Sequence, residues 1–431
     1  MDGPGRSALP GGGRSVLALV LALQVVDSVD VAVFAVFSAD IRDDLQVSEA
    51  AVATVASLAG VMVALASLPL GLLADRRPRT LIAGVLTVAW AAAAALLGAV
   101  QSLWQLVAVR AVAGLGKAGE GPVQTTMLVD AHPPAVRGRV LGVQRAGQPF
   151  GAAVGPALAA VVAASVPAGE SAWRWAFAIL AVIGAVLAVC ALRLPDPGRG
   201  RFDGTSPLVA PVPVRVAWRR LYAVRCLRAV LVGLGALGLC LAAIPSYLGF
   251  VLADDLGQDA AARGVITAVC ACGGLVGAVV AGAVGDRLFR HSPPLTLRVA
   301  GTALALLGVG FAVQAHASTV TVFVVTGVLT QALTFAGVVL VTLVVSAVTP
   351  PELRSTAFAA VGVYLAVVGG LLGALITGVA ADLWGARPAI AVVAAPASVL
   401  AGAVLVAGAA HLRRDVAAVA ALRGRAPSDI R

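Results

Sequence analysis

The chain has 431 residues, of which 60% are hydrophobic and only 12% are charged. An average soluble domain carries roughly 25% charged residues, so this chain cannot cover a globular surface with charge and must face lipid. The formal net charge of +10 resembles that of a nucleic-acid-binding protein. However, the arginines gather at the ends of apolar stretches without interleaved aromatic residues, and we expect no nucleic-acid partner.

Apolar stretches of about 20 residues, the length that crosses a bilayer, recur along the whole chain. We therefore predict an all-α membrane protein with twelve transmembrane helices in contact with the lipid bilayer. In chain order, the predicted helices are 15–38, 50–73, 80–100, 103–128, 139–164, 172–193, 229–252, 262–284, 296–316, 319–347, 355–381 and 387–410.

The longest interruption follows the sixth predicted helix, where a segment rich in proline and glycine runs into a basic stretch. It divides the chain into two groups of six helices. The predicted organisation is an N-terminal tail (1–14), a first bundle (15–193), a linker (194–228), a second bundle (229–410) and a C-terminal tail (411–431).

The basic residues predict the orientation of the chain. Both tails, the linker and one set of loops are rich in arginine, whereas the loops on the other side carry only Arg42, Arg174, Arg263 and Arg387. The positive-inside rule places both termini in the cytoplasm of a multi-pass protein, for which we expect the inner (plasma) membrane. The first apolar stretch contains two aspartates and is too long for a cleavable signal peptide.

Two short motifs recur in the two halves. Gly71, Asp75, Arg76 and Arg79 form the first copy of one motif, and Gly282, Asp286 and Arg287 form the second copy at matching positions. The sequence Pro-Pro-x-x-Arg occurs at 133–137 and again at 350–354. An internal repeat of this length indicates two similar bundles, an arrangement that is typical of secondary transporters.

These motifs resemble the major facilitator superfamily over the whole chain. The first copy matches its signature between helices two and three, Arg110 begins a helix-four motif, and Gly151, Gly155 and Pro156 fit its helix-five antiporter motif. The resemblance implies two six-helix bundles related by a pseudo-two-fold axis, a central cavity and alternating access. We expect the repeated loop motifs to act as a conformational latch.

The segment from Arg110 to Pro122 looks like the spinster-type and drug–proton antiporter branches of that family. Two positions depart from the spinster pattern, with Lys117 where an acid is usual and Val31 where an arginine follows the helix-one acid. A proton-coupling role therefore does not transfer unchanged.

The charged residues predicted at membrane depth all lie in the first half. They are Asp27, Asp30, Arg110, Lys117, Glu120 and Arg145. Such charges are costly in lipid and must face a cavity or pair with one another. Residues three or seven positions apart share a helix face, so we predict a cluster of helix-one acids with helix-four charges.

In this cluster, Asp30 is the first candidate for proton coupling, followed by Glu120 and Asp27. Lys117, Arg110 and Arg145 are candidates for binding an anionic substrate, and Gln148, Tyr247, Gln331 and Tyr364 could line its path. The alternative is that the charges are structural pairs and that the remaining residues pack.

We therefore predict a secondary transporter, not an enzyme, that moves a small organic solute, amphiphilic or anionic, by alternating access with proton-coupled export. Uptake of an organic anion by symport and a non-transporting sensor or scaffold remain alternatives. No nucleophile–base pair or metal cluster lies at membrane depth, so we expect no cofactor or metal. A monomer is expected.

Overall fold

The computed structural model describes residues 11–74, 77–119, 123–167, 169–198, 214–241, 244–349 and 353–423. All regular structure in these ranges is helical. The elements are α1 (Gly11–Val36), α2 (Ser38–Leu45), α3 (Glu49–Ala74), α4 (Arg79–Leu97), α5 (Leu103–Lys117), α6 (Thr125–Ala131), α7 (Pro134–Ser165), α8 (Ala172–Arg193), α9 (Val214–Ala223), α10 (Arg225–Leu241), α11 (Ile244–Phe250), the π-helical η2 (Val251–Asp255), α12 (Ala260–His291), α13 (Pro293–Ala315), α14 (Val320–Val348), α15 (Arg354–Val363), the π-helical η4 (Tyr364–Leu371), α16 (Leu372–Trp384) and α17 (Ala386–Arg423).

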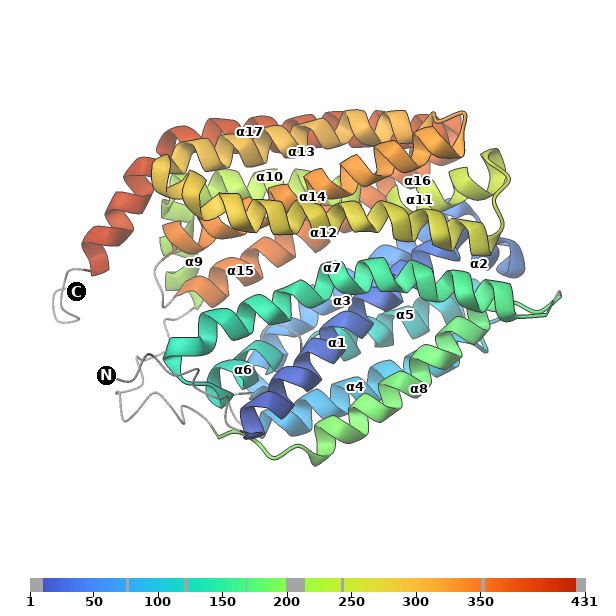
Figure 1. Ribbon diagram of the computed structural model, residues 1–431, viewed down its shortest axis with the longest axis horizontal. Helices are drawn as coiled ribbons and strands as arrows, with labels where there is room; N and C mark the ends of the chain where they lie inside the picture. Colours follow the sequence, from blue (N-terminus) through green and yellow to red (C-terminus); the bar gives the residue numbers. More distant parts are fainter. Residues whose placement is uncertain are drawn as a thin grey trace, which may run out of the picture.

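The helices form two groups that lie side by side, α1–α8 in one and α10–α17 in the other (Figure 1). The long helices of both groups run along the long axis of the molecule. We call the end where α1 begins and α17 ends the terminal end, and the opposite end, which carries α2 and η2, the far end.

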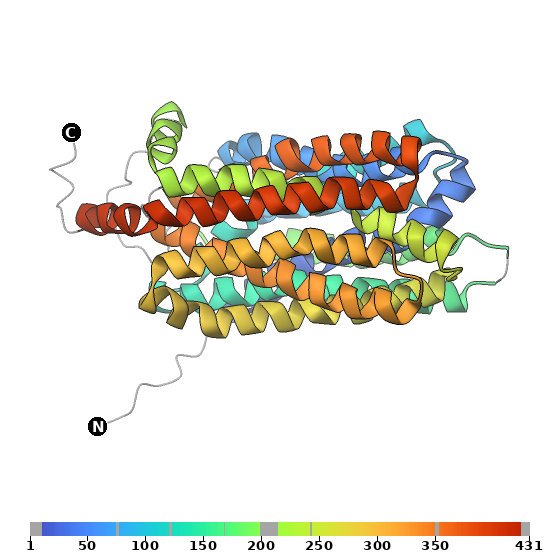
Figure 2. The ribbon, with the colours of Figure 1, turned by 90° about the horizontal axis from the view of Figure 1, so that it is seen from above.

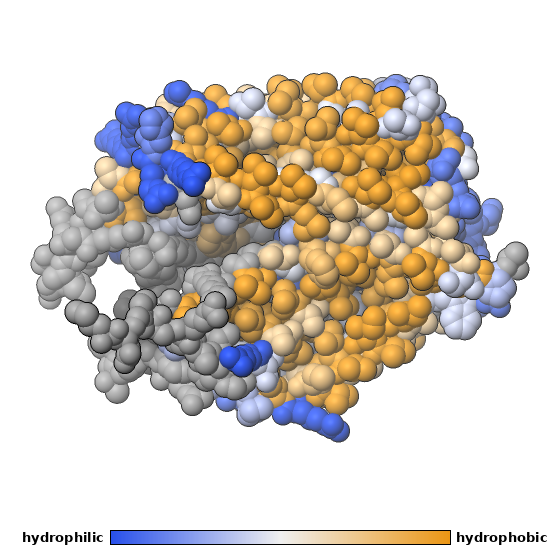
Figure 3. All heavy atoms as spheres, in the orientation of Figure 1, coloured by the Kyte–Doolittle hydropathy of each residue, from blue (hydrophilic) through white to orange (hydrophobic). Residues whose placement is uncertain are grey.

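The surface between these two ends is apolar. Within the described residues, eleven helices or helix runs are long and apolar enough to cross a membrane. Side chains such as Val182, Val279 and Leu383 are well exposed on this surface. Figure 3 shows the resulting apolar belt with hydrophilic residues at both ends of the molecule. This distribution suits a bilayer, because water would penalise so much exposed apolar area.

The fourth predicted span, 103–128, is divided. The sequence predicts one helix over 103–128, whereas α5 ends at Lys117 and α6 begins only at Thr125. Between them the sequence reads Gly119-Glu-Gly-Pro122. Proline has no N–H to donate and glycine is a poor helix former, so this segment opposes a continuous helix. Residues 120–122 lie outside the described residues, and the N–H groups of Val123 and Gln124 both donate to the Gly119 carbonyl oxygen at 3.0 Å. The predicted helix is thus described as two α-helical segments, α5 and α6, along which the apolar pattern continues.

Other predicted boundaries also shift. The first predicted helix is interrupted at Phe37 and continues as α2, and the predicted linker contains α9. The seventh and eleventh predicted helices each pass through a π-helical segment, η2 and η4. The last helix continues to Arg423, so much of the predicted C-terminal tail is helical.

Glycines bring the helices that surround the first-half charges close together. A Cβ atom on Gly151 of α7 would lie 2.4 Å from the Val25 carbonyl oxygen of α1. A Cβ atom on Gly264 of α12 would lie 2.6 Å from the Pro156 carbonyl oxygen of α7, where the two helix groups touch. Close backbone approach favours helix association in a membrane, where water supplies no driving force.

Candidate functional site

A cluster of buried charges lies between α1 and α5. Asp30 Oδ2 of α1 accepts hydrogen bonds from Arg110 Nη1 at 3.1 Å and from Lys117 Nζ at 2.7 Å. The two cations are about two helical turns apart on α5 and so share one face. The side chains of Asp30 and Arg110 are each 2% exposed, and that of Lys117 is 8% exposed. Such burial is tolerated only because each charge has a partner.

Asp27 joins the cluster from the preceding turn of α1. Lys117 Nζ lies 2.6 Å from Asp27 Oδ1 and also donates to the Asp27 carbonyl oxygen at 3.2 Å. The guanidinium of Arg110 lies 4.4 Å from the centre of the Phe34 ring, in cation–π geometry. Two carboxylates therefore face two cations, and Lys117 connects both acids.

A small polar cavity of about 30 Å³ adjoins Lys117. It is large enough for a water molecule. Three polar atoms near the cavity are buried and have no hydrogen-bond partner among the described residues, namely Gln24 Oε1, Trp90 Nε1 and Gln124 Oε1. The charged cluster thus adjoins uncompensated hydrogen-bonding groups, which can support the rearrangement of a proton or of a polar ligand group.

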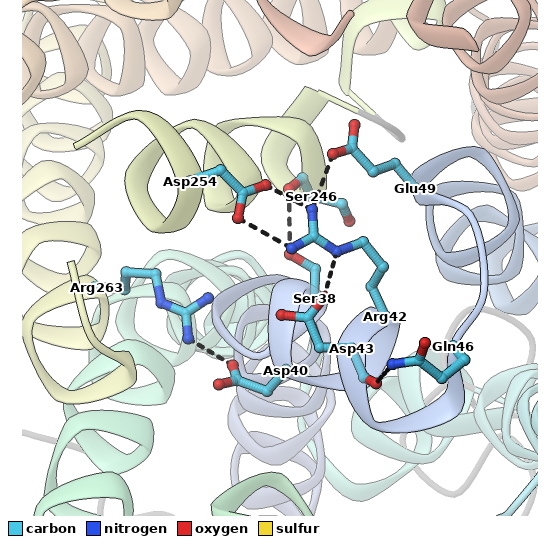
Figure 4. A network of polar contacts seen from close by, with 9 residues as sticks. All are labelled: Ser38, Asp40, Arg42, Asp43, Gln46, Glu49, Ser246, Asp254 and Arg263. Carbon is cyan, nitrogen blue, oxygen red and sulfur yellow. Dashed lines mark hydrogen bonds and ion pairs between the residues drawn. The ribbon is translucent and has the colours of Figure 1, made fainter. Parts of the chain in front are cut away.

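A second polar network joins the two helix groups at the far end, and Figure 4 shows it in detail. Arg42 of α2 binds Asp254 of η2 with two hydrogen bonds, of 2.5 and 2.9 Å. The same guanidinium contacts Glu49 of α3 at 3.0 Å and Asp43 at 2.7 Å. Arg42 therefore holds acids from both groups together.

Two further contacts in Figure 4 cross the same boundary. Arg263 Nη2 of α12 donates to Asp40 Oδ2 of α2 at 2.6 Å, and the Arg263 side chain is only 3% exposed. Ser38 Oγ donates to the Ser246 carbonyl oxygen of α11 at 3.1 Å. We call the contacts of Ser38, Asp40, Arg42, Ser246, Asp254 and Arg263 the far-end seal.

The far-end seal shifts the pKa values of its members. Burial raises the pKa of the Asp40 carboxyl, and the nearby Arg263 only partly offsets this effect. The hydrogen bonds from Arg42 to Asp254 raise the pKa of Arg42 further above its usual range, despite partial burial of the guanidinium. Burial therefore disfavours the ionised form of Asp40.

Comparison with known proteins identifies the family. The sequence model of the Major Facilitator Superfamily matches residues 20–374, which is most of the chain. The chain belongs to this superfamily. It is therefore a multi-pass membrane protein with the twelve-helix facilitator architecture, and the sequence-based predictions of fold and family are confirmed. Its relatives and its fold are those of transporters and not of enzymes.

Individual facilitators match at low identity. A probable L-galactonate transporter of Escherichia coli is 26% identical over 288 residues, covering 64% of this chain and 62% of that protein. A probable sulfoacetate transporter of Cupriavidus necator is 26% identical over 309 residues, with 68% of each chain covered. The chain spans less than two thirds of the first of these relatives.

Solved structures share the fold. A bacterial homologue of the human lysosomal transporter spinster, in an inward-facing and unoccupied conformation, aligns with a TM-score of 0.80 at 18% identity, covering 96% of this chain and 99% of that one. A D-xylose–proton symporter aligns with a TM-score of 0.66 at 15% identity, covering 93% and 97%. At such identities the likeness shows the fold alone.

The structure of this facilitator brings together four of the predicted site residues, namely Asp27, Asp30, Arg110 and Lys117. Glu120 and the Arg145 side chain lie outside the described parts of the chain. The charged cluster is therefore described for helices one and four only.

The four residues predicted to line the substrate path are dispersed. Gln148 is exposed on α7, and Gln331 is half-buried on α14. Tyr247 is fully buried on α11, where its ring meets Phe250 edge-on and its hydroxyl has no hydrogen-bond partner among the described residues. Tyr364 begins η4, and its hydroxyl contacts that of Tyr222 on α9.

The loop motif of this facilitator is only partly described, since Asp75 and Arg76 lie outside the described residues. Gly71 is in the last turns of α3. Arg79 forms an ion pair with Asp130 of α6, and its backbone N–H donates to Asp196 Oδ2 at 2.7 Å. These contacts tie α4 to α6 and to the segment after α8.

The second copy of the motif lies in α12. Gly282 has open space around it, and Arg287 is exposed. The Asp286 side chain lies outside the described side chains. The latch role predicted for both motif copies remains a prediction.

The helix-five motif has a packing role. Gly155 of α7 approaches α1 so closely that a Cβ atom would lie 2.8 Å from Ala32 Cβ, and Gly151 makes a similar approach one turn earlier. Pro156 directs its carbonyl oxygen toward Gly264 of the other group. The motif therefore allows α7 to pack tightly against both α1 and α12.

Sequence reasoning missed the far-end seal. Arg42 and Arg263 were used only as exceptions to the positive-inside pattern. The available signal was that both occur beside acids at helix ends in the two halves, Asp40 to Asp44 in one and Asp254 to Asp255 in the other.

Proposed function

We propose that this facilitator is a secondary transporter that carries a small organic anion together with a proton by alternating access. The observation that carries the proposal is that a single buried carboxylate, Asp30, binds both Arg110 and Lys117. These two cations are the groups that a substrate carboxylate or sulfonate would need.

Competition between Asp30 and a substrate anion for the two cations would couple the transport of a proton to the transport of the anion. While Asp30 is ionised, it pairs with both Arg110 and Lys117, and together with Asp27 it balances their charge. Protonation of Asp30 removes that negative charge and leaves buried cations that require a new anion. A substrate anion can then take its place, so a proton and an anion are bound together and the buried charge stays balanced.

The relatives support an anionic substrate. L-galactonate and sulfoacetate, named for the two relatives above, are both anions at neutral pH. A D-galactonate transporter of Escherichia coli is also 25% identical over 310 residues. The cavity next to Lys117 holds no more than about a water molecule in this state, so the substrate proposal rests on the buried cations and not on the size of the cavity.

The far-end seal supports alternating access. It joins the two helix groups at one end by charged contacts that can break without disrupting either group. We infer that the terminal end faces the cytoplasm of the plasma membrane, in line with its many arginines, and that the described state is closed toward the outside.

A second candidate function is export of an amphiphile. The observation that favours it is the segment from Arg110 to Pro122, which resembles the spinster branch, together with a 24% identical stretch of 171 residues in the spinster protein of Drosophila melanogaster. Here Lys117 would meet the charged group of a lysolipid. The same assay separates the two candidates.

The test uses the purified full chain. Its thermal midpoint is first measured with D-galactonate, L-galactonate, sulfoacetate, lysophosphatidylglycerol and a drug cation, because a ligand that binds the folded form raises the midpoint by mass action. The stabilising compound is then assayed in proteoliposomes with and without an inward proton gradient. We expect an anion to bind and the gradient to drive its accumulation.

Two variants sharpen this test. Asp30→Asn should still bind the anion but should lose accumulation driven by the gradient, whereas Asp382→Asn, which alters an exposed aspartate on α16, should behave like the unchanged protein. Gradient-driven accumulation by Asp30→Asn would refute the coupling role. Binding of the drug cation alone would refute the anion proposal, and binding of lysolipid alone would favour the exporter.

A further inference from the structure

The short helix α9 lies outside both helix groups, at the terminal end. It runs across the direction of the long helices, as both views show (Figures 1 and 2). In a bilayer with the apolar belt at its centre, α9 would therefore lie along the membrane surface rather than through it. Its apolar side is anchored, because Leu221 is 1% exposed and Trp218 is half-buried.

The opposite side of α9 and the start of α10 are strongly basic. Arg219, Arg220, Arg225 and Arg228 are all exposed. No ion pair within the described residues neutralises any of them. Four unpaired arginines within ten residues, next to a transmembrane helix, form the pattern that attracts anionic lipid head groups.

Two aromatic residues connect this basic surface to the second helix group. Trp218 and Tyr222 pack with ring centroids 5.7 Å apart, at the depth where aromatic residues anchor helices in the interface. The Tyr222 hydroxyl contacts that of Tyr364, which is the first residue of η4. A movement of α9 would therefore reach η4, the π-helical segment of a transmembrane helix, through this contact.

The segment η4 is itself held closely against α10. A Cβ atom on Gly238 would lie 2.2 Å from the Leu365 carbonyl oxygen, and one on Gly369 would lie 2.3 Å from the Gly235 carbonyl oxygen. The Tyr364 ring also lies next to Gly235. A π-helical segment often marks a functional position in a helix. Here the first residue of η4, Tyr364, contacts Tyr222 of the membrane-surface helix α9.

We propose that α9 and the first turn of α10 form a binding surface for anionic phospholipid head groups, and that the Tyr222–Tyr364 contact transmits lipid binding to η4. The inference does not depend on the proposed function, because it requires no particular substrate. Charge and placement favour lipid over a soluble acidic partner, since the surface lies in the plane that head groups occupy.

The first experiment measures lipid binding by the purified, delipidated full chain in a neutral detergent. Thermal midpoints are recorded with added phosphatidylglycerol or phosphatidylcholine. We expect phosphatidylglycerol to raise the midpoint far more than phosphatidylcholine, and this difference to shrink in high salt. The variant Arg219→Gln/Arg220→Gln should lose most of the difference.

The matched control is Arg413→Gln/Arg414→Gln, which removes the same charge from exposed positions of α17. It should respond to phosphatidylglycerol like the unchanged protein. The proposal fails if the α9 variant keeps the full response, or if both variants lose it equally, because the effect would then follow net charge alone. Unchanged midpoints without lipid show that the variants fold.

The second experiment tests the connection to η4 by hydrogen exchange in nanodiscs of either lipid. Phosphatidylglycerol should increase protection in α9 and in η4. Tyr222→Phe should keep the protection in α9 and lose it in η4, because only the hydroxyl contact is removed. Protection of η4 that persists in Tyr222→Phe would overturn the connection, and a lipid-independent α9 would overturn the binding surface.

Discussion

Lys117 forms ion pairs with two acids at once, which is unusual for a single side chain in a membrane. It is paired with Asp27 and with Asp30, and it is the cation nearest to the polar cavity. Removing one member of a buried ion pair is strongly destabilising because the remaining charge has no partner. The stability of the cluster therefore depends on balance more than on any one contact.

This balance predicts a non-additive pair of variants. Lys117→Met should destabilise the protein by about 3–5 kcal/mol, since two acids would share Arg110 alone. Adding Asp27→Asn should restore part of that loss, because Asp30 and Arg110 then form a complete pair. Thermal unfolding of the purified proteins in detergent measures both effects. A double variant no more stable than Lys117→Met would contradict the pairing.

Asp40 predicts how pH affects the far-end seal. Its pKa is raised by burial in the sealed state and would be ordinary once the far end opens to solvent. The sealed state therefore binds a proton more tightly, so a falling pH favours sealing even though protonation weakens the contact with Arg263. The stabilisation of the sealed state by proton binding is lost as the pH rises through the raised pKa of Asp40.

The measurement is the distance between spin labels on exposed positions of α2 and of the segment between η2 and α12. Acidification toward the ordinary aspartate range should increase the short-distance population in the unchanged protein. Asp40→Asn should reduce this dependence, and the remainder should come from Glu49, whose pKa is also raised by burial. A population that opens as the pH falls would reverse the assigned sign.

Among individual residues, those of the buried charged cluster could be predicted from the sequence, but those of the far-end seal could not. Rare charges in apolar helices are costly, so Asp30, Arg110 and Lys117 attract attention in the sequence alone, and helical spacing places them on common faces. Arg42 and Arg263 lie at helix ends, where charge is ordinary. Their partners are in the opposite half of the chain, and no local pattern specifies that pairing.

Among the elements, α7 and α12 form a contact between the two helix groups that depends on a small residue, Gly264. Gly264 leaves no room for a side chain between these helices, since it approaches both the Pro156 carbonyl oxygen and the Ala160 side chain. Two helices that meet through backbone atoms can slide or tilt with little interlocking of side chains.

Gly264→Leu should therefore destabilise the protein by roughly 1–3 kcal/mol, the usual cost of overpacking, and should separate the helix groups at the far end. Gly282→Leu is a matched control on the same helix, because open space surrounds Gly282. Melting curves and the spin-label distance described above report the two effects. Equal behaviour of the two variants would show that the α7–α12 contact is not tight.

The helix boundaries show where apolar pattern alone fails. The pattern predicts one helix over 103–128, but Gly119 and Pro122 already contain the signal for a break. The helix α9 was assigned to the linker because its arginines interrupt any apolar run. Amphipathic helices on a membrane surface are hydrophobic along one side only, and so they escape a search for spans.

At the scale of the whole molecule, the far-end seal connects the two helix groups across the boundary between them. Some other polar contacts at the far end act within one group. Asp44 Oδ2, for example, accepts from Arg174 Nη2 at 2.9 Å and from Trp173 Nε1 at 3.1 Å, all in the first group. Contacts of the two kinds should therefore respond differently to loss of an arginine.

Arg42→Gln should shift the molecule toward a far-end-open state, because Asp254, Glu49 and Asp43 would then repel one another. The short-distance population between the far-end labels should fall several-fold. Arg174→Gln, the matched loss within one group, should lower the thermal midpoint without changing that distance. An unchanged distance in Arg42→Gln would contradict its sealing role.

Contacts in the two halves of the far-end seal are related by a common offset in the sequence. Asp254 follows Asp40 by as many residues as Arg263 follows Glu49. The Asp40–Arg263 contact and the Asp254–Glu49 approach are thus equivalent under the pseudo-two-fold axis, as in the isologous interface of a homodimer. The residue at the same offset from Arg42 is Leu256. The two related acid positions are therefore stabilised differently, since Asp40 pairs directly with Arg263, whereas Asp254 is bridged to Glu49 by Arg42, an arginine without a counterpart in the second half.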